Sequence, residues 1–409
     1  MSLLDKASII ITPNGVKPAK LYAYKPDNGN GDLTWTRGTT ATRVNSIGNI
    51  ETVAIDTPRI NYPPLGGCPS ILAEPQRTNF VPYSNDFTTW TTYNSILTPN
   101  IATSLDGTLN GSKLIATIDD THHIIYHPTA KWDTTEKSFS LFVEANEYSK
   151  IYIANGSTAY ASWFDLGTGT VEGTGGGFVG KIKDYKNGWF KITATYTATV
   201  VSVISIGLYQ TFTGNRLVDR KFIGDGISGV NIFESQLEDG GFDTTPIRTN
   251  GVILTRLKDL YDRDNVYTNN LITSNGGSWL IDLTNNTVKT RDAIGGGLTL
   301  DTNTGGKTNG LEISNTNGTD RFSLSKYVAT VLTTLYTTTT NDCKVLFNWD
   351  GVLLNIYENG VQVVIDEPFT ITAMEFLQGN CIDQSYELKQ EVLTSEPLTH
   401  EEAIQITTL

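Results

Sequence analysis

The sequence predicts an all-β protein in which two antiparallel, jelly-roll-like β-sandwiches follow an irregular N-terminal arm, with a short helix at the C-terminus. Three observations predict this class. Apolar and polar residues alternate with a period of two along many short segments, which is typical of half-buried strands. Asn-Gly and Asp-Gly pairs, which suit tight hairpin turns, separate these segments. Helical patterns are scarce over the 409 residues, and many short strands with polar turns favour sandwiches.

The first 77 residues are predicted to be an arm. They are rich in proline and glycine, and residues 61–67 have the sequence Asn-Tyr-Pro-Pro-Leu-Gly-Gly. Such a stretch shows no strand or helix period, so we expect it to dock onto a partner and to become ordered there.

Residues 78–248 form the first predicted sandwich. Residues 190–198 alternate strictly between apolar and polar side chains, so one face of this strand is buried and the other meets water. Asn187 and Gly188 mark the turn before it. The same alternation is present in residues 139–145 and 204–208.

Residues 249–409 form the second predicted sandwich. Its clearest part is an antiparallel meander, because two turn pairs divide three short apolar segments. The expected strands and turns are residues 345–349, Asp350-Gly351, residues 352–358, Asn359-Gly360 and residues 361–365.

A short helix is predicted near the C-terminus, over residues 398–404. Thr399 can accept a hydrogen bond from the backbone N–H of Glu402, and the Glu402 side chain can accept one in return. This reciprocal pair is the capping box that begins many helices.

Charge and composition exclude several classes of protein. The chain has 30 Lys and Arg against 43 Asp and Glu, a net charge of −13, which disfavours binding to nucleic acid. It contains no run of about 18 apolar residues that could span a membrane, and no signal peptide is expected. Cys68, Cys343 and Cys381 are widely spaced, which predicts buried thiols rather than disulfides or a zinc site.

No catalytic residue, metal site or cofactor is predicted, and we expect the protein not to be an enzyme. His123 and His127 would share a strand face but lie about 13 Å apart, too far to bind one ion. We therefore expect surface or edge-strand positions for them and for His122. Asp259 and Asp262, with Asp264 after them, are expected in a solvated turn.

Aromatic side chains are the better candidates for a binding role. Sugars stack their apolar faces on exposed Trp and Tyr rings, while polar neighbours bind the hydroxyl groups. Trp132 follows a predicted loop, and Tyr160 and Trp163 lie on opposite sides of one predicted strand. These three residues are the candidate platform for a glycan.

The N-terminal segments also carry a family resemblance. Taken together they resemble a region common in bacteriophage structural proteins, although Gly38-Thr39-Thr40 and Phe80 depart from the usual pattern. The segments concerned are residues 31–37, 41–45, 48–51, 58–62, 72–79 and 83–87, and Trp90.

Later segments resemble two sandwich modules. Residues 164–171, 187–190 and 236–240 are similar to a carbohydrate-binding-module-like sandwich. Residues 255–259 and 397–403 resemble the entry and the terminal helix of a concanavalin-like, or laminin-G-like, sandwich.

The resemblance implies a virion protein, such as a tail fibre, head fibre or other appendage, attached by residues 1–77 to the capsid or the tail. Its partners would be other virion proteins, copies of itself in a homotrimer, and the surface polysaccharide of a bacterium. Two alternatives stay open: a polysaccharide depolymerase of the virion, and a purely architectural spacer.

Overall fold

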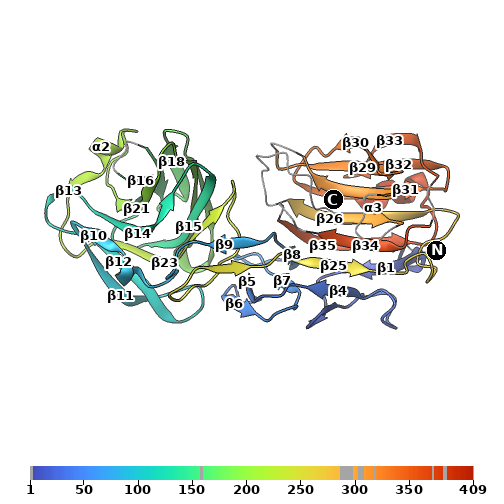
Figure 1. Cartoon of the computed structure of the whole chain (residues 1–409), viewed down its shortest axis with the longest axis horizontal. Helices are drawn as coiled ribbons and strands as arrows, with labels where there is room; N and C mark the ends of the chain where they lie inside the picture. Colours follow the sequence, from blue (N-terminus) through green and yellow to red (C-terminus); the bar gives the residue numbers. More distant parts are fainter. Residues whose placement is uncertain are drawn as a thin grey trace.

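A computed structural model describes residues 3–156, 160–285, 298–302, 308–316, 319–370, 373–380 and 385–408. It contains two β-sheet bodies that lie one after the other along the longest axis of the molecule (Figure 1). The predicted all-β class, with two sandwiches of antiparallel strands, is confirmed.

The first body is a sandwich of two six-stranded sheets around one apolar core. The strands predicted at residues 139–145, 190–198 and 204–208 are confirmed as β15, β20 and β21. One sheet has the spatial order β10 (Thr91–Tyr93), β14 (Ile124–Trp132), β21 (Ser202–Leu208), β16 (Lys150–Asn155), β17 (Ala161–Asp165) and β18 (Thr170–Thr174). The facing sheet has the order β11 (Ser95–Thr103), β12 (Leu109–Ala116), β23 (Gly229–Asp239), β15 (Glu136–Ala145), β20 (Trp189–Thr197) and β19 (Val179–Asp184).

The second body packs an eight-stranded sheet on a nine-stranded sheet. The first consists of β33 (Val361–Pro368), β32 (Leu353–Glu358), β31 (Asp342–Trp349), β26 (Gly277–Asn285), β35 (Tyr386–Thr394), β8 (Ser70–Ala73) and β7 (Arg59–Asn61), with β1 (Ala7–Ile11) beside β35. The second consists of β2 (Val16–Lys17), β3 (Lys20–Leu21), β4 (Leu33–Thr36), β25 (Leu260–Arg263), β34 (Phe376–Asn380), β27 (Leu298–Asp301), β28 (Gly310–Asn315), β29 (Phe322–Val328) and β30 (Val331–Thr337).

Local signals predicted the end of the chain well. The meander is confirmed as β31, β32 and β33, and Asn359 and Gly360 have the positive φ angles, 48° and 81°, that the turn requires. The helix is confirmed as α3 (His400–Thr407). Its capping box is complete: Glu402 N donates to Thr399 Oγ1 at 3.3 Å, and Thr399 N donates to Glu402 Oε2 at 2.9 Å.

The prediction of an irregular arm over residues 1–77 is wrong. Strand β1 pairs with β35, β8 pairs with the other end of β35, and β4 pairs with β25. The N-terminal segment is therefore part of both sheets of the second body. Its strands are only two to five residues long, too short for a period of two to be visible. Distant strands offer the edges with which β1, β4 and β8 pair.

The same N-terminal segment also contacts the first body. The hairpin of β5 (Ala41–Val44) and β6 (Ile50–Val53) places Val44 and Ile50 against Phe142, Trp189 and Phe233 on the outer face of the first sandwich. Nearby, β9 (Arg77–Asn79) pairs with β24 (Leu254–Arg256) across the junction between the bodies (Figure 1).

Among the described residues, no helix is long and apolar enough to cross a membrane. Cys343 is buried as expected, Cys68 is exposed contrary to expectation, and Cys381 lies outside the described residues.

The remaining short helices and strands are α1 (Leu3–Lys6), η1 (Phe87–Thr89), β13 (Asp120–His122), η2 (Lys186–Gly188), α2 (Arg216–Asp219) and β22 (Lys221–Ile223).

Candidate functional site

Five charged side chains are buried where the N-terminal segment and the two bodies meet, and we call them the junction network. Arg37, Arg59 and Glu74 come from the N-terminal segment, next to or within β4, β7 and β8. Arg256 ends β24, and Asp259 lies just before β25. None of the five is more than 2% exposed. Three guanidinium groups and two carboxylates are thus shielded from water.

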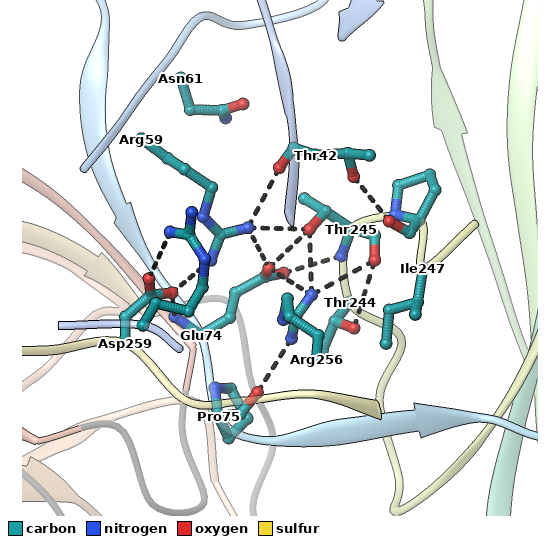
Figure 2. Close-up of polar contacts among 12 residues, drawn as sticks. Thr42, Arg59, Asn61, Glu74, Pro75, Thr244, Thr245, Ile247, Arg256 and Asp259 are labelled. Carbon is teal, nitrogen blue, oxygen red and sulfur yellow. Dashed lines mark hydrogen bonds and ion pairs between the residues drawn. The ribbon is translucent and has the colours of Figure 1, made fainter. Parts of the chain in front are cut away.

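Arg59 lies between the two carboxylates of the network, as Figure 2 shows. Its Nη1 donates to Glu74 Oε2 at 2.6 Å, and its Nη2 donates to Asp259. Nη1 also donates to the Thr42 carbonyl at 3.1 Å and to Thr245 Oγ1 at 2.9 Å. Burial alone would lower the pKa of Arg59, but the charges of Asp259 and Glu74 raise it above its usual value. Arg59 therefore keeps its charge inside the fold.

Glu74 joins the network to the first sandwich. It accepts hydrogen bonds from the Thr245 backbone N–H at 2.8 Å and from Thr245 Oγ1 at 2.6 Å, in the segment that follows β23. It also pairs with Arg256 Nη1 at 2.8 Å. Burial alone would raise the pKa of Glu74, but the charges of Arg256 and Arg59 outweigh it and hold the pKa below its usual range. Glu74 is therefore ionised.

Asp259 joins the network to the second body. It accepts from Arg37 Nη1 at 3.0 Å and from the Glu74 backbone N–H at 3.0 Å. Arg37 is fixed in turn by its bond to the Ala54 carbonyl at 2.6 Å. The expectation of a solvated turn is therefore wrong for Asp259, which arginines from far earlier in the chain surround, and for Asp262, which lies within β25.

The network is suited to positioning rather than to chemistry. A glycosidase needs a carboxyl group that still carries its proton and that reaches the substrate. Glu74 is ionised and shielded, and Asp259 is fully buried beside two arginines. What the five side chains do is connect the N-terminal segment, the first sandwich and the second body at one point.

A cavity of about 500 Å³ adjoins the network between the two bodies. Glu74 lines it from the network side, Lys191 and Asp243 from the first body, and Glu387 from the second. Lys191 pairs with Asp243 at 2.5 Å, and Glu387 accepts from Ser70 Oγ at 2.7 Å. Bonds within each body thus hold Lys191, Asp243 and Glu387 in the cavity walls.

The three predicted aromatic residues do not form one platform. The Trp132 ring lies in the core of the first sandwich, and the Trp163 ring packs under Phe212 on the other side of the sheet, with ring centroids 5.4 Å apart. Both rings are at most 1% exposed, so neither offers a face to a sugar, and the prediction is wrong for these two. Tyr160 is 46% exposed, and its role in glycan binding stays a prediction.

Two of the four histidines, His123 and His127, are core residues. His123 is fully buried, with Nε2 2.9 Å from the Phe222 carbonyl oxygen. His127 is buried beside the Trp90 ring, with centroids 5.0 Å apart. The expected surface positions are wrong for these two because neighbouring segments cover the strand on both faces. Within the described part of the chain, no three His, Cys, Asp or Glu residues lie close enough together to bind a metal ion.

Sequence reasoning did not single out the junction network, although a signal for it was present. Three of its charged residues lie in the N-terminal segments that carry the family resemblance, and the other two lie in residues 255–259, which resemble a sandwich module. Arg59 illustrates the signal, because it stands between Pro58 and Ile60 in a short apolar segment. A charge in such a place needs a buried partner.

Comparisons with known proteins leave the family open. The chain is matched by no protein-family model and by no curated protein. It is similar to domain 4 of AbnA, a GH43 extracellular arabinanase of Geobacillus stearothermophilus solved with arabinotriose. That match has 11% identity and a TM-score of 0.28, and covers 42% of this chain and 84% of that one.

Two further structures are of the Trypanosoma rangeli sialidase. The sialidase in complex with sialic acid is 10% identical with a TM-score of 0.25, and a mutant displaying trans-sialidase activity is 9% identical with a TM-score of 0.27. Each match covers 72% of this chain, which spans 60% of the length of the sialidase chain. At these values the likenesses carry no argument about ligand or reaction.

Proposed function

We propose that this chain is a structural component of a bacteriophage particle, a fibre or appendage subunit that holds its two sandwiches as one rigid unit. The observation that carries the proposal is the junction network. Three of its five charges, those of Arg37, Arg59 and Glu74, come from segments that resemble phage structural proteins. The other two come from residues 255–259, which resemble the entry to a concanavalin-like sandwich.

Rigidity follows from the burial of these charges. Interfaces between domains of one chain commonly allow relative motion. Here, separating the bodies would break the hydrogen bonds that Glu74, Arg59 and Arg256 make with Thr245 of the first body. It would also expose the buried charges of the network to water. The hairpin β5–β6 adds an apolar contact to the same junction. A part that links a particle to a cell surface needs this fixed spacing.

In this proposal the partners are other virion proteins of the capsid or tail, further copies of the chain in a closed cyclic assembly, and bacterial surface polysaccharide. Strands between residues 7 and 79 are built into the fold. Attachment to the particle therefore uses a folded face rather than an extended arm.

The test is whether the protein is part of purified particles. Density-gradient particles of the phage that encodes the chain should contain the protein by mass spectrometry, and a specific antibody should label them at a constant position. The Asp259→Asn protein should be incorporated poorly, whereas Asp342→Asn, which removes an exposed pair with Lys389, should be incorporated normally. A protein that stays wholly in the soluble lysate contradicts the proposal.

A further inference from the structure

A groove of about 550 Å³ lies on the outer face of the first sandwich, far from the junction network in sequence. Strands β14 and β21 supply much of its lining, and Arg220, just after α2, and His122, at the end of β13, contribute from neighbouring segments. Its volume falls in the range of small-molecule sites, about 300–1,000 Å³.

The strand register explains which side chains face the groove. Tyr126 on β14 lies opposite Ser205 on β21, and Lys131 lies opposite Val203. The neighbouring Ile125 belongs to the core of the sandwich. Because successive side chains on a strand point to opposite faces, Tyr126 points outward into the groove.

The groove is basic in an acidic protein. Within the described part of the chain, neither Lys131 nor Arg220 has an ion pair, and the buried Nε of Arg220 has no hydrogen-bond partner. No carboxylate is among the described residues that line the groove, although the whole chain carries a net charge of −13. Two unpaired cations facing one space favour an anionic ligand.

The other side chains of the groove suit a sugar. Tyr126 is half-buried and offers aromatic surface, and Ser202 lines the groove with a hydroxyl group. The His122 ring is held by stacking on Tyr93, with centroids 4.6 Å apart. Burial, with the positive charge of Arg220, lowers the pKa of His122 to about 4, so this ring is neutral at pH 7.

We propose that this groove binds a sugar unit that carries a carboxylate or a phosphate group, with Arg220 and Lys131 binding the anionic group and Tyr126 the apolar face of the ring. Guanidinium and ammonium groups form strong, charge-assisted hydrogen bonds with such anions. The inference rests on the proposed function, in which the ligand is the acidic polysaccharide of a bacterial surface.

The experiment is isothermal titration calorimetry on the full chain at low salt. The probes are tri-galacturonic acid, its neutral methyl ester, glucose 6-phosphate and glucose, with inorganic phosphate and a single-stranded oligonucleotide as competitors. We expect at least one acidic sugar to bind, and its neutral counterpart to bind about tenfold more weakly or not at all. Which acidic sugar binds distinguishes the carboxylate from the phosphate.

Variants identify the site. Lys131→Gln and Arg220→Gln should each weaken binding of the acidic sugar about tenfold, with melting temperatures close to that of the original protein. The matched control is Lys181→Gln, which removes an exposed positive charge from β19 in the facing sheet, and it should bind normally.

Four results would overturn the inference: no binding of either acidic sugar, equal binding of the neutral ester, equal loss in the Lys181→Gln control, or tighter binding of inorganic phosphate or the oligonucleotide. Incorporation into particles is measured separately. A protein that is incorporated into particles but binds no acidic sugar contradicts this inference alone. A protein that is absent from particles contradicts the proposed function.

Discussion

Single buried charges determine how firmly the junction is held. Asp259 is fully buried and pairs with both Arg37 and Arg59. Its neutralisation therefore affects two arginines at once, as would that of Glu74, which pairs with Arg59 and Arg256. The paired arginines have no access to water that could replace the lost carboxylate charge.

The substitution Asp259→Asn should lower the free energy of unfolding by about 3–5 kcal/mol, because it leaves the buried guanidinium of Arg37 without its counter-charge and leaves Arg59 with Glu74 alone. Urea denaturation monitored by tryptophan fluorescence measures this. The control Asp342→Asn removes the exposed pair with Lys389 and should cost about 1 kcal/mol or less. Equal effects of the two substitutions would show that burial of the network is unimportant.

Glu391 should give the second body a specific pH dependence. Its side chain is fully buried and accepts a hydrogen bond from Trp279 Nε1 at 2.8 Å, and burial raises the pKa of Glu391 to about 7. The folded state therefore binds a proton that the unfolded state releases near pH 4.5. From this group, stability is fully present below about pH 4.5 and is lost as pH rises to about 7.

The variant Glu391→Gln should remove this dependence, because the amide oxygen can still accept from Trp279 without titrating. Relative to the original protein, it should be more stable at pH 8 by about 3 kcal/mol and nearly unchanged at pH 4.5. Thermal unfolding at several pH values checks this. A constant difference between the two proteins from pH 4.5 to 8 would contradict the account.

The sequence alone could not predict which side chains are covered or paired by residues that lie far away in the chain. Trp163 was a reasonable candidate for an exposed ring until Phe212, about fifty residues later, was seen to cover it. Likewise, the residues around Asp259 do not predict its pairing with Arg59, which lies 200 residues away in the chain. Long-range partners, rather than residue type, decided both outcomes.

At the scale of single elements, local chemistry explains α3. Its capping box satisfies backbone groups that the helix itself leaves free. The helix then packs Ala403 and its neighbours on the outer face of the eight-stranded sheet. The helix begins at the predicted place because all the residues that define its start are adjacent in sequence.

Replacing Thr399 with alanine should therefore cost about 1 kcal/mol of stability, since the first-turn N–H groups lose their acceptor. Chemical denaturation measures the loss. Glu401→Gln, two residues away and exposed, is the control and should be nearly neutral. If the Thr399→Ala protein is as stable as the control, the cap contributes nothing.

Strand β1 is the opposite case, an element that the sequence did not reveal. Ile9 is fully buried and lies opposite Leu393 on β35. Strand β1 pairs with β35, which lies near the other end of the chain. The periodicity of residues 7–11 alone therefore could not predict this strand. The alternation in β20 was visible because that strand has nine residues.

If β1 is part of the core, Ile9→Ala should destabilise the second body by about 2–5 kcal/mol. Its matched control is Ile47→Ala, in the same N-terminal segment but 69% exposed. Faster proteolysis within residues 260–408 of the Ile9 variant, with the first sandwich intact, is the expected result. An arm that docks only on a partner would make the two variants indistinguishable.

At the scale of the whole molecule, the N-terminal segment makes two bodies into one unit. It supplies strands to the second body, a hairpin against the first, and three of the five charges between them. The sequence predicted two sandwiches and placed their boundary near residue 248, close to the β9–β24 pair. Residues 1–77 were predicted to be a separate arm because their strands are short and the stretches between these strands are rich in proline and glycine.

The rigid junction is tested most directly by double electron–electron resonance between two spin labels. The labels are attached at Ile118→Cys and Val361→Cys, one exposed site in each body. Cys68, an exposed native thiol, and Cys381, which lies outside the described residues, are replaced by serine. The account predicts one narrow distance distribution, which broadens when Asp259→Asn is added. A broad distribution in the protein with an intact network would contradict it.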